Sequence, residues 1–218
     1  MTVSIRNYIR PHHYGFQSIT FGAHTFQSGE HPRASDTDTG VTMLDLLALV
    51  QTCAAEIETT TMLRVIAVES SGNPNAIGIV GGALEWQPRN QPEALVMIKR
   101  LEVQGVNYSV GLGQVNKKNF RRYGITAEQA LEPCANLRVA ATILKECFLR
   151  AKKGKASQKE LQKALRDAFS CYYAGNFITG YRLGYVSKVV SAVPSVPSPR
   201  LHKLGTSSGK RPSFLPDP

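Results

Sequence analysis

Residues 62–74 read MLRVIAVESSGNP and combine an apolar helical face with a carboxylate at its end. Four of these positions are spaced i, i+3, i+4 and i+7, which places them on one side of an α-helix: Met62, Val65, Ile66 and Glu69. Gly72 and Pro74 follow at once and predict that the helix ends within a turn. The pattern therefore puts a single acidic side chain on a face that should be buried.

Glu69 is costly to bury unless its charge is neutralised or partnered. Burial and the negative end of the helix dipole both favour the protonated carboxyl. A carboxyl group that keeps its proton near neutral pH can serve as a general acid. The alternative is a solvated glutamate at the edge of its helix, as most helix-end glutamates are. The segment alone does not separate these two interpretations.

Composition indicates one globular domain with a strongly basic balance. The chain has 218 residues, 42% of them hydrophobic, which is enough to bury a substantial core. The net charge of +10 favours an anionic partner, which could be nucleic acid, a membrane surface or an anionic cell wall. Charge does not choose among these three.

Apolar runs in this sequence are short. No stretch approaches the 18 or so consecutive apolar residues of a transmembrane helix, so none is expected. The N-terminus lacks the basic-then-apolar profile of a secretory signal. The first apolar run, residues 43–50, is interrupted by Asp45 and has no basic cluster before it, so a signal beginning at Met43 is a poor alternative.

Cysteine and histidine placement excludes several chemistries. The four cysteines, Cys53, Cys134, Cys147 and Cys171, form no CxxC pair, which argues against a zinc site or a thioredoxin-type centre. They fit two disulfides in an oxidising compartment, with all three pairings open, or four buried thiols. All five histidines lie outside residues 43–193, so a His-based catalytic triad or metal site is not expected: His12, His13, His24, His31 and His202.

The chain divides into three parts. Residues 1–42 are polar without a sustained period and are expected to be a poorly ordered extension. Residues 43–193 carry dense helix signals and form the predicted domain. Residues 194–218 hold half of the twelve prolines and form a basic, Pro/Ser-rich tail.

The predicted domain is mostly α. Helices are expected over residues 43–57, up to Glu69, over 91–104, from Pro133, up to about Gly175, and around 185–190. Thr126 with Gln129, and Ser157 with Glu160, have capping-box spacing. Residues 77–82 are too rich in glycine for a helix and are expected to form a loop. No run alternates long enough to demand a sheet.

Three further segments are expected to form connections or boundaries between helices, and not packed helix faces. Residues 107–116 read NYSVGLGQVN and could be a tight turn or a place where the backbone approaches a ligand closely. Residues 132–137, EPCANL, place Asn136 in the first turn of a helix, where a polar cap is the ordinary role. Residues 171–176, CYYAGN, run an aromatic pair into a glycine stop, and such aromatics are usually core.

Together and in this order, the segments resemble the lytic transglycosylases of the lysozyme-like superfamily. The matching elements are Glu69-Ser70, the Gly-Leu-x-Gln turn of residues 111–114, Asn136-Leu137, and residues 172–175, which correspond to a Tyr-x-Ala-Gly motif. The same segments look most similar to the subgroup encoded with type IV secretion systems, as the first component of the VirB operon. The resemblance covers roughly residues 43–193.

The resemblance implies a lysozyme-like fold, a periplasmic location and peptidoglycan glycan strands as substrate. It also implies that Glu69 protonates the bond between N-acetylmuramic acid and N-acetylglucosamine and then accepts the proton of the sugar's own 6-hydroxyl, leaving a 1,6-anhydro end. Neither a second carboxylate nor a cofactor or metal is required. Substrate contacts are implied for Ser70, which could also orient the acid, and for Ser109, Gly111, Leu112, Gly113, Gln114, Asn136, Tyr172 and Tyr173.

Two departures from the family pattern stand out. Gly113 replaces the usual methionine of Gly-Leu-Met-Gln, which is expected to remove a side chain that lines the cleft. Residues 81–107 form a long insertion between the first two motifs, and its helix could form one wall of the cleft.

Other functions remain open at this level. A glycan hydrolase of the same fold, such as a phage endolysin, and a non-catalytic wall-binding or assembly module both fit the motifs. A nucleic-acid binder is disfavoured, because the positive charge lies in tails and helix ends and not in a recognition helix. The C-terminal tail could dock to secretion components or to the anionic wall, or be a solvated end.

Overall fold

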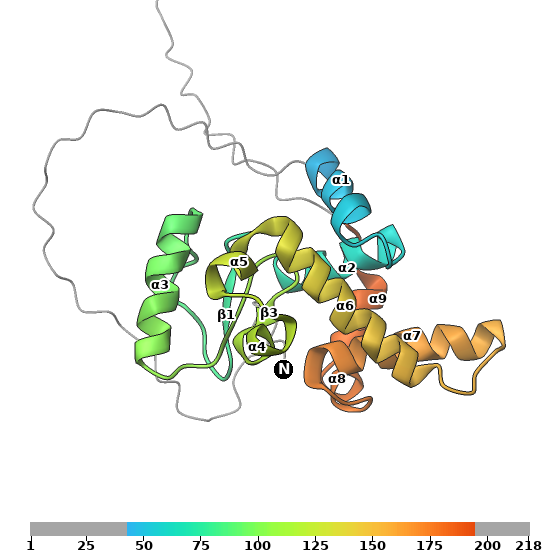
Figure 1. Cartoon of the computed structure of the whole chain (residues 1–218). Helices are drawn as coiled ribbons and strands as arrows, with labels where there is room; N and C mark the ends of the chain where they lie inside the picture. The colour runs from blue at the N-terminus through green and yellow to red at the C-terminus, as the bar shows by residue number, and fades with distance from the viewer. Residues whose placement is uncertain (1–42, 195–218) are drawn as a thin grey trace, which may run out of the picture.

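The computed structural model describes residues 43–194 (Figure 1). The expected N-terminal extension lies outside the described residues, and so does the predicted tail except for Pro194. In chain order the elements are α1 Met43–Cys53, α2 Thr59–Glu69, β1 Ile77–Ile79, α3 Gln91–Val103, β2 Tyr108–Val110, β3 Val115–Asn116, a 3-10 turn η1 Lys117–Asn119, α4 Phe120–Tyr123, α5 Ala127–Leu131, α6 Pro133–Ala151, α7 Gln158–Ala174, α8 Thr179–Arg182 and α9 Tyr185–Ser191. The mostly helical fold predicted from the sequence is confirmed.

Helix α6 is the central element of the helical part. It packs against α1, α5 and α7, while α2 packs against α1 and α9. One apolar stripe of α6 is buried in this core: Leu137, Ala140, Leu144 and Cys147. Long-range packing of this one helix therefore connects the N-terminal and C-terminal helices.

Capping side chains begin four of the described α-helices: α2, α3, α5 and α7. Both predicted capping boxes form, at the starts of α5 and α7. Gly175 ends α7 in the left-handed conformation, with φ +75°. Helix α1 ends at Cys53, earlier than the predicted Ile57, and α2 begins at Thr59. Glu58 sets the start of α2, because its carboxylate accepts hydrogen bonds from two amides of the first turn of that helix.

A small antiparallel sheet was missed by the sequence analysis. Strands β1, β2 and β3 pair in that order, with Ile77 opposite Val110 and Ser109 opposite Asn116. The segment expected to be a loop at 77–82 therefore contains a strand. Each strand is two or three residues long and buried on both faces, so no alternation marks it in the sequence.

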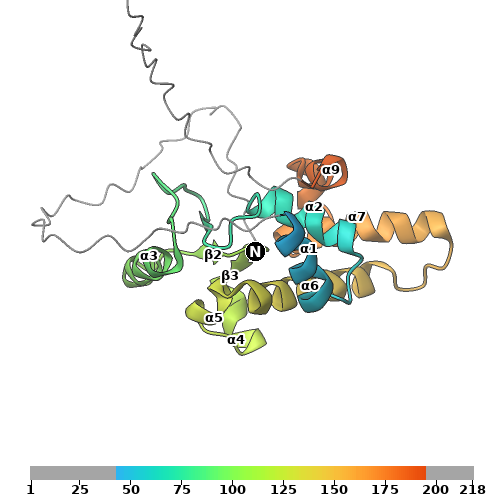
Figure 2. The ribbon, with the colours of Figure 1, turned by 90° about the horizontal axis from the view of Figure 1, so that it is seen from above.

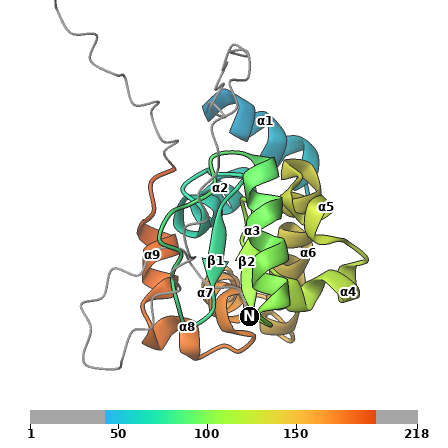
Figure 3. The ribbon, with the colours of Figure 1, turned by 90° about the vertical axis from the view of Figure 1, so that its left-hand side faces the viewer.

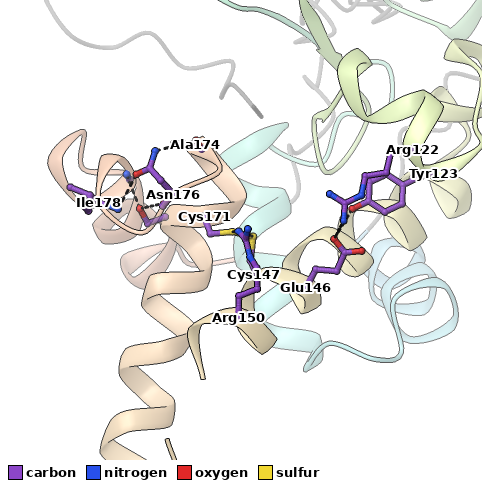
Figure 4. The surroundings of a disulfide bond; sticks show 11 residues. Arg122, Tyr123, Glu146, Cys147, Arg150, Cys171, Ala174, Asn176 and Ile178 are labelled. Atoms are coloured by element: carbon purple, nitrogen blue, oxygen red, sulfur yellow. Dashed lines mark hydrogen bonds and ion pairs between the residues drawn. A yellow bond between two sulfur atoms is a disulfide. The ribbon is translucent and has the colours of Figure 1, made fainter. Parts of the chain in front are cut away.

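The two disulfides expected from the sequence form, and both connect α6 to a neighbouring helix. Cys53 at the end of α1 pairs with Cys134 at the start of α6, and Cys147 in α6 pairs with Cys171 in α7. The structure thus selects one of the three pairings left open. Figure 4 shows Arg150 beside the second disulfide, where its guanidinium contacts the sulfur of Cys171.

The helices and the sheet are arranged along one long direction. In Figures 1 and 2 helix α3 lies at one end, and the turn between α6 and α7 lies at the opposite end. Figure 3 shows α3 in front of β1 and β2. Across residues 43–194, no helix is both long and apolar enough to cross a membrane. The same residues contain no cluster of three potential metal-binding side chains.

Candidate active site

Glu69 is the last residue of α2, and its side chain is 0% exposed. The three residues that share its helical face, Met62, Val65 and Ile66, are buried with it. The solvated helix-end glutamate considered above is therefore excluded. The chain reverses directly after it, because Ser71 and Gly72 both adopt positive φ, at +54° and +81°. Glu69 is thus fixed by the packing of its helix and by a turn.

Tyr185, from α9, supplies the hydrogen bond that Glu69 receives. The phenolic hydroxyl of Tyr185 donates to Oε1 of Glu69 at 2.5 Å, and both side chains are buried. Oε2 of Glu69 is buried and has no hydrogen-bond partner among the described residues. An unpaired buried oxygen is costly for a carboxylate and less so for a carboxylic acid, since a protonated oxygen carries no full charge.

Burial raises the pKa of Glu69 to about 8, and the hydrogen bond from Tyr185 acts in the opposite direction without cancelling it. The position at the C-terminal end of α2 also disfavours a negative charge. Glu69 therefore keeps its proton at neutral pH. Because Oε1 accepts from Tyr185, the geometry places that proton on Oε2.

Three tyrosines surround this carboxyl group. Tyr173 stacks on Tyr185 with ring centroids 4.6 Å apart. Tyr172 is buried, and its pKa is raised well above the ordinary value by burial and by the charge of Glu69. The hydroxyl of Tyr172 donates to the carbonyl of Gly113 at 2.6 Å. Helices α7 and α9 therefore enclose the acid and connect it to the turn at 111–114.

Tyr185 is the residue that the sequence analysis missed as part of the site. It lies in the helix expected around residues 185–190, and its ring is buried together with Val186 and Val189. The one available signal was a hydroxyl-bearing side chain in an otherwise aliphatic stripe. A buried tyrosine hydroxyl requires a partner, but the sequence does not say which.

The turn at residues 111–114 is held on both sides by hydrogen bonds. Gly111 has φ +77° and donates its amide to the carbonyl of Ala76 at 2.9 Å. Gln114 has φ +49°, and its Nε2 donates to the carbonyls of Ala76 and Gly111, both at 3.0 Å. Oε1 of Gln114 is buried without a hydrogen-bond partner in the described region. Gln114 thus shapes the turn and retains one acceptor oxygen.

Asn136 has a supporting role in this turn. Its Oδ1 accepts from the amide of Gly113 at 2.8 Å, and its Nδ2 donates to the carbonyls of Val110 and Ala130 at 2.9 and 2.7 Å. Both amide protons are therefore used inside the protein. The geometry supports a clamp between α6 and the turn, and does not favour the direct substrate contact expected for Asn136.

Gly113 differs from its expected role. A Cβ at this position would lie 2.5 Å from Cβ of Ala140 and 3.0 Å from the hydroxyl of Tyr172. The missing side chain therefore faces α6 and not an open cleft, which corrects the expectation that Gly113 removes a cleft-lining group. Leu112 is likewise fully buried in the core.

The two serines form hydrogen bonds within the protein, Ser70 next to the acid and Ser109 in the sheet. Oγ of Ser70 donates to the carbonyl of Ile66 at 3.3 Å and accepts from the amide of Gly72 at 3.2 Å. Ser70 thus stabilises the reversal after Glu69, and no hydrogen bond joins it to the carboxyl among the described contacts. Oγ of Ser109 accepts from Nδ2 of Asn116 at 3.1 Å, a bond across β2 and β3.

A mostly helical, disulfide-bonded domain with a small antiparallel sheet and one buried, protonated glutamate defines a protein of the lysozyme-like class. Residues 47–188 match the family model described as "Transglycosylase SLT domain". The chain belongs to this family of transglycosylase SLT domains.

Curated relatives refine the resemblance. The "Type IV secretion system protein virB1" of Brucella abortus biovar 1 (strain 9-941) is 43% identical over 162 residues, which span 72% of this chain and 67% of the relative. The "Protein virB1" of Rhizobium radiobacter is 38% identical over 146 residues, or 66% of this chain and 59% of the relative. The likeness to lytic transglycosylases of the VirB1 type is thereby confirmed. No solved structure matches the chain.

Proposed function

We propose that this protein is a peptidoglycan lytic transglycosylase that cleaves the bond between N-acetylmuramic acid and N-acetylglucosamine and leaves 1,6-anhydromuramoyl ends. The observation that carries the proposal is the state of Glu69. Its pKa of about 8 keeps it protonated at neutral pH, and its Oε2 is not engaged by any other group in the described region. The membership in the SLT family supports the same chemistry.

The proposed reaction uses Glu69 twice. The proton on Oε2 passes to the glycosidic oxygen as the bond from that oxygen to C1 of the muramic acid breaks. The resulting carboxylate then accepts the proton of the sugar's 6-hydroxyl, and O6 forms a bond to C1. Protons and bonds balance without water, metal or cofactor. The hydrogen bond from Tyr185 stabilises the carboxylate between the two transfers.

The alternative is a hydrolase of the same fold. Ordinary glycosidases need a second carboxylate, about 5–9.5 Å from the first. Among the described residues the other buried acid is Asp167, and its carboxylate is held by Lys163 and Tyr181. Nor does any second acid contribute to the pKa of Glu69. These observations favour a mechanism with one acid.

Mass spectrometry of muropeptides tests the proposal. Digestion of purified peptidoglycan by the wild-type protein should yield fragments ending in anhydromuramic acid, and Glu69→Gln should yield none. Fragments heavier by one water, with reducing ends, would identify a hydrolase instead. A Glu69→Gln protein that still cleaves would remove the acid assignment, and a wild type that only binds would support the non-catalytic module.

We further propose that the protein acts in the periplasm, where peptidoglycan lies, and opens the wall for assembly of a type IV secretion or conjugation apparatus. The support is the name of the Brucella relative. Complementation of a deletion strain tests this role: the wild type should restore secretion and Glu69→Gln should not. The docking role predicted for the C-terminal tail concerns residues outside the described region, and truncation after Val193 tests it.

A further inference from the structure

We propose that a hollow beside Trp86 binds a sugar unit of the glycan strand at a distance from Glu69, a proposal that rests on the proposed function. The hollow has a volume of about 360 Å³ and lies where the loop before α3 meets that helix. Its lining includes the indole of Trp86, the aliphatic chains of Val96 and Met97, and the charged groups of Arg89, Glu93 and Arg100. Apolar walls with a few polar groups are typical of small-ligand sites of this size.

Trp86 and Val96 are exposed although both are strongly apolar. Their exposed fractions are 53% and 52%, while the opposite side of α3 buries Ala94, Ile98 and Leu101 in the core. Adjacent apolar side chains left in water commonly mark a binding surface. An indole ring offers a flat apolar face with a polar edge, which suits the apolar C–H face of a pyranose ring bordered by hydroxyls.

The position of Trp86 is fixed relative to the sheet by its neighbour Gln87. Oε1 of Gln87 accepts from the amide of Ile77 at 2.8 Å, and Nε2 donates to the carbonyl of the same residue at 2.9 Å. Ile77 pairs with Val110, the residue before Gly111. The loop that carries Trp86 is therefore attached to β1 at the end of the sheet that leads into the 111–114 turn.

Two polar groups of the hollow, Arg89 and Glu93, interact with each other at the start of α3. Arg89 and Glu93 form an ion pair with Nη2 and Oε1 3.1 Å apart, and Oε2 of Glu93 accepts the backbone amide of Arg89 at 2.9 Å. Asn90 caps α3 between them. Arg89 and Glu93 offset each other's charge, and with Arg100 the lining carries one net positive charge. These donors and the one acceptor can bind sugar hydroxyl and acetamido groups.

A second hollow continues the first along α3. It has a volume of about 300 Å³, lies beside Lys99, Val103 and Gln104, and shares Arg100 with the first. Two adjoining hollows along one helix suit an extended polymer, since successive units can occupy successive sites. Figures 1 and 3 show α3 on the outer side of the sheet.

The chain contains a single tryptophan, so its fluorescence reports on this hollow alone. The probe is the tetramer of N-acetylglucosamine, titrated into the full-length Glu69→Gln protein to prevent cleavage. We expect a saturable change in emission, and Arg89→Ala should weaken the apparent affinity about tenfold. Lys153→Ala, between α6 and α7 at the far end of the molecule, should leave the affinity unchanged. Absence of any saturable change would overturn the proposal.

Kinetics on insoluble peptidoglycan provide an independent readout. In the otherwise wild-type protein, Trp86→Ala should raise KM about tenfold with kcat within about twofold, and Trp86→Phe should restore most of the loss. An unchanged KM while anhydro products still form would refute this site and leave the proposed function intact. If the wild type cleaves nothing but the tetramer still changes its fluorescence, the proposed function fails and the sugar site stands. Loss of secretion by Trp86→Ala with unchanged sugar binding and KM would instead indicate a protein partner and overturn the saccharide assignment.

Discussion

Glu69 combines two properties that oppose each other in an ordinary surface residue: it is ionisable, and it is fully buried. The apolar face of α2 provides the burial, and the turn at Ser71 and Gly72 stops the helix where the carboxyl group meets Tyr185. Ionisation of this buried carboxyl group lowers the free energy of unfolding. That cost is measurable because it depends on pH.

The stability of the folded protein should therefore fall as pH rises between the ordinary glutamate value of 4.5 and about 8. In this window the folded protein holds a proton on Glu69 that the unfolded chain has released, so unfolding is favoured by about 1.4 kcal/mol per pH unit. Glu69→Gln cannot ionise and should lose this slope. Urea unfolding at pH 4.5 and pH 7.5 checks it: the variant should gain stability relative to wild type only at the higher pH.

Glu128→Gln is the matched control, because Glu128 is an exposed acid in the first turn of α5. It should leave the pH dependence of stability as it is in the wild type. A Glu69→Gln protein whose stability follows pH as steeply as the wild type would mean that Glu69 is ionised in the folded state.

Tyr185→Phe should alter the acid without removing it. The hydrogen bond from Tyr185 lowers the pKa of Glu69, so its loss should raise that pKa further and destabilise the carboxylate formed during the reaction. The limb of the pH–rate profile at which activity is lost with rising pH should move to higher pH. We expect kcat to fall about tenfold or more.

Tyr181→Phe provides the comparison for this experiment. It also removes a tyrosine hydroxyl that donates to a carboxylate, in this case Asp167 at 2.8 Å on α7. Its pH–rate profile should match the wild type. A shift of equal size in both variants would show that the effect of Tyr185 is general destabilisation of the fold.

At the scale of elements, helices could be predicted from the sequence and the sheet could not. The helix signals are local: the capping boxes at Thr126 and Ser157 and the glycine at 175 act on backbone groups within a few residues. Strand β1 is defined by a partner more than 30 residues away, since Ile77 pairs with Val110, while β2 and β3 pair locally across the 111–114 turn. All three strands are too short to show a period.

The candidate site shows the same difference between features set by local sequence and features set by distant partners. Glu69 could be predicted because its own helix carries the apolar face that buries it. Its partner Tyr185 lies 116 residues away, and no local pattern relates the two. The roles of Asn136 and Gly113 depend on how closely α6 approaches the 111–114 turn, which is a property of packing and not of a motif.

That close approach predicts the effect of Gly113→Ala. The added methyl group would lie 2.5 Å from Cβ of Ala140, and neither that atom nor the backbone of α6 can move without disturbing the core. We expect a loss of about 1–3 kcal/mol in unfolding free energy. Activity should fall as well, because the hydroxyl of Tyr172 is displaced from the carbonyl of Gly113.

Gly82→Ala is the control for this change, measured by thermal or urea unfolding. Gly82 has no positive φ, and its added Cβ would meet only the side chain of Ile79, at 3.4 Å. Its stability should stay within about 0.5 kcal/mol of the wild type. Equal losses in both variants would contradict the tight packing inferred at Gly113.

At the scale of the whole molecule, α6 connects the two ends of the described chain through covalent bonds as well as packing. One disulfide joins its start to α1, and the other joins its last turns to α7. The paired cysteines lie 81 residues apart in the first bond and 24 residues apart in the second. Because a cross-link restricts the unfolded chain, the longer loop should contribute more, about 4.5 against about 3.5 kcal/mol.

For activity the order should be reversed. Loss of the Cys147–Cys171 bond should lower kcat more than loss of the Cys53–Cys134 bond. Cys171 directly precedes Tyr172, which contacts both the 111–114 turn and the surroundings of Glu69. The double variant Cys147→Ser with Cys171→Ser should therefore lower kcat even where the protein remains folded. The double variant Cys53→Ser with Cys134→Ser should unfold at lower urea but retain kcat below its transition, because this bond lies at the α1 end of the core. Urea unfolding and muropeptide release, both measured without reductant, separate the two effects. Equal losses of kcat in the two variants, compared at equal folded fractions, would show that the Cys147–Cys171 bond does not help to position Tyr172 near Glu69. The bond would then act only on global stability.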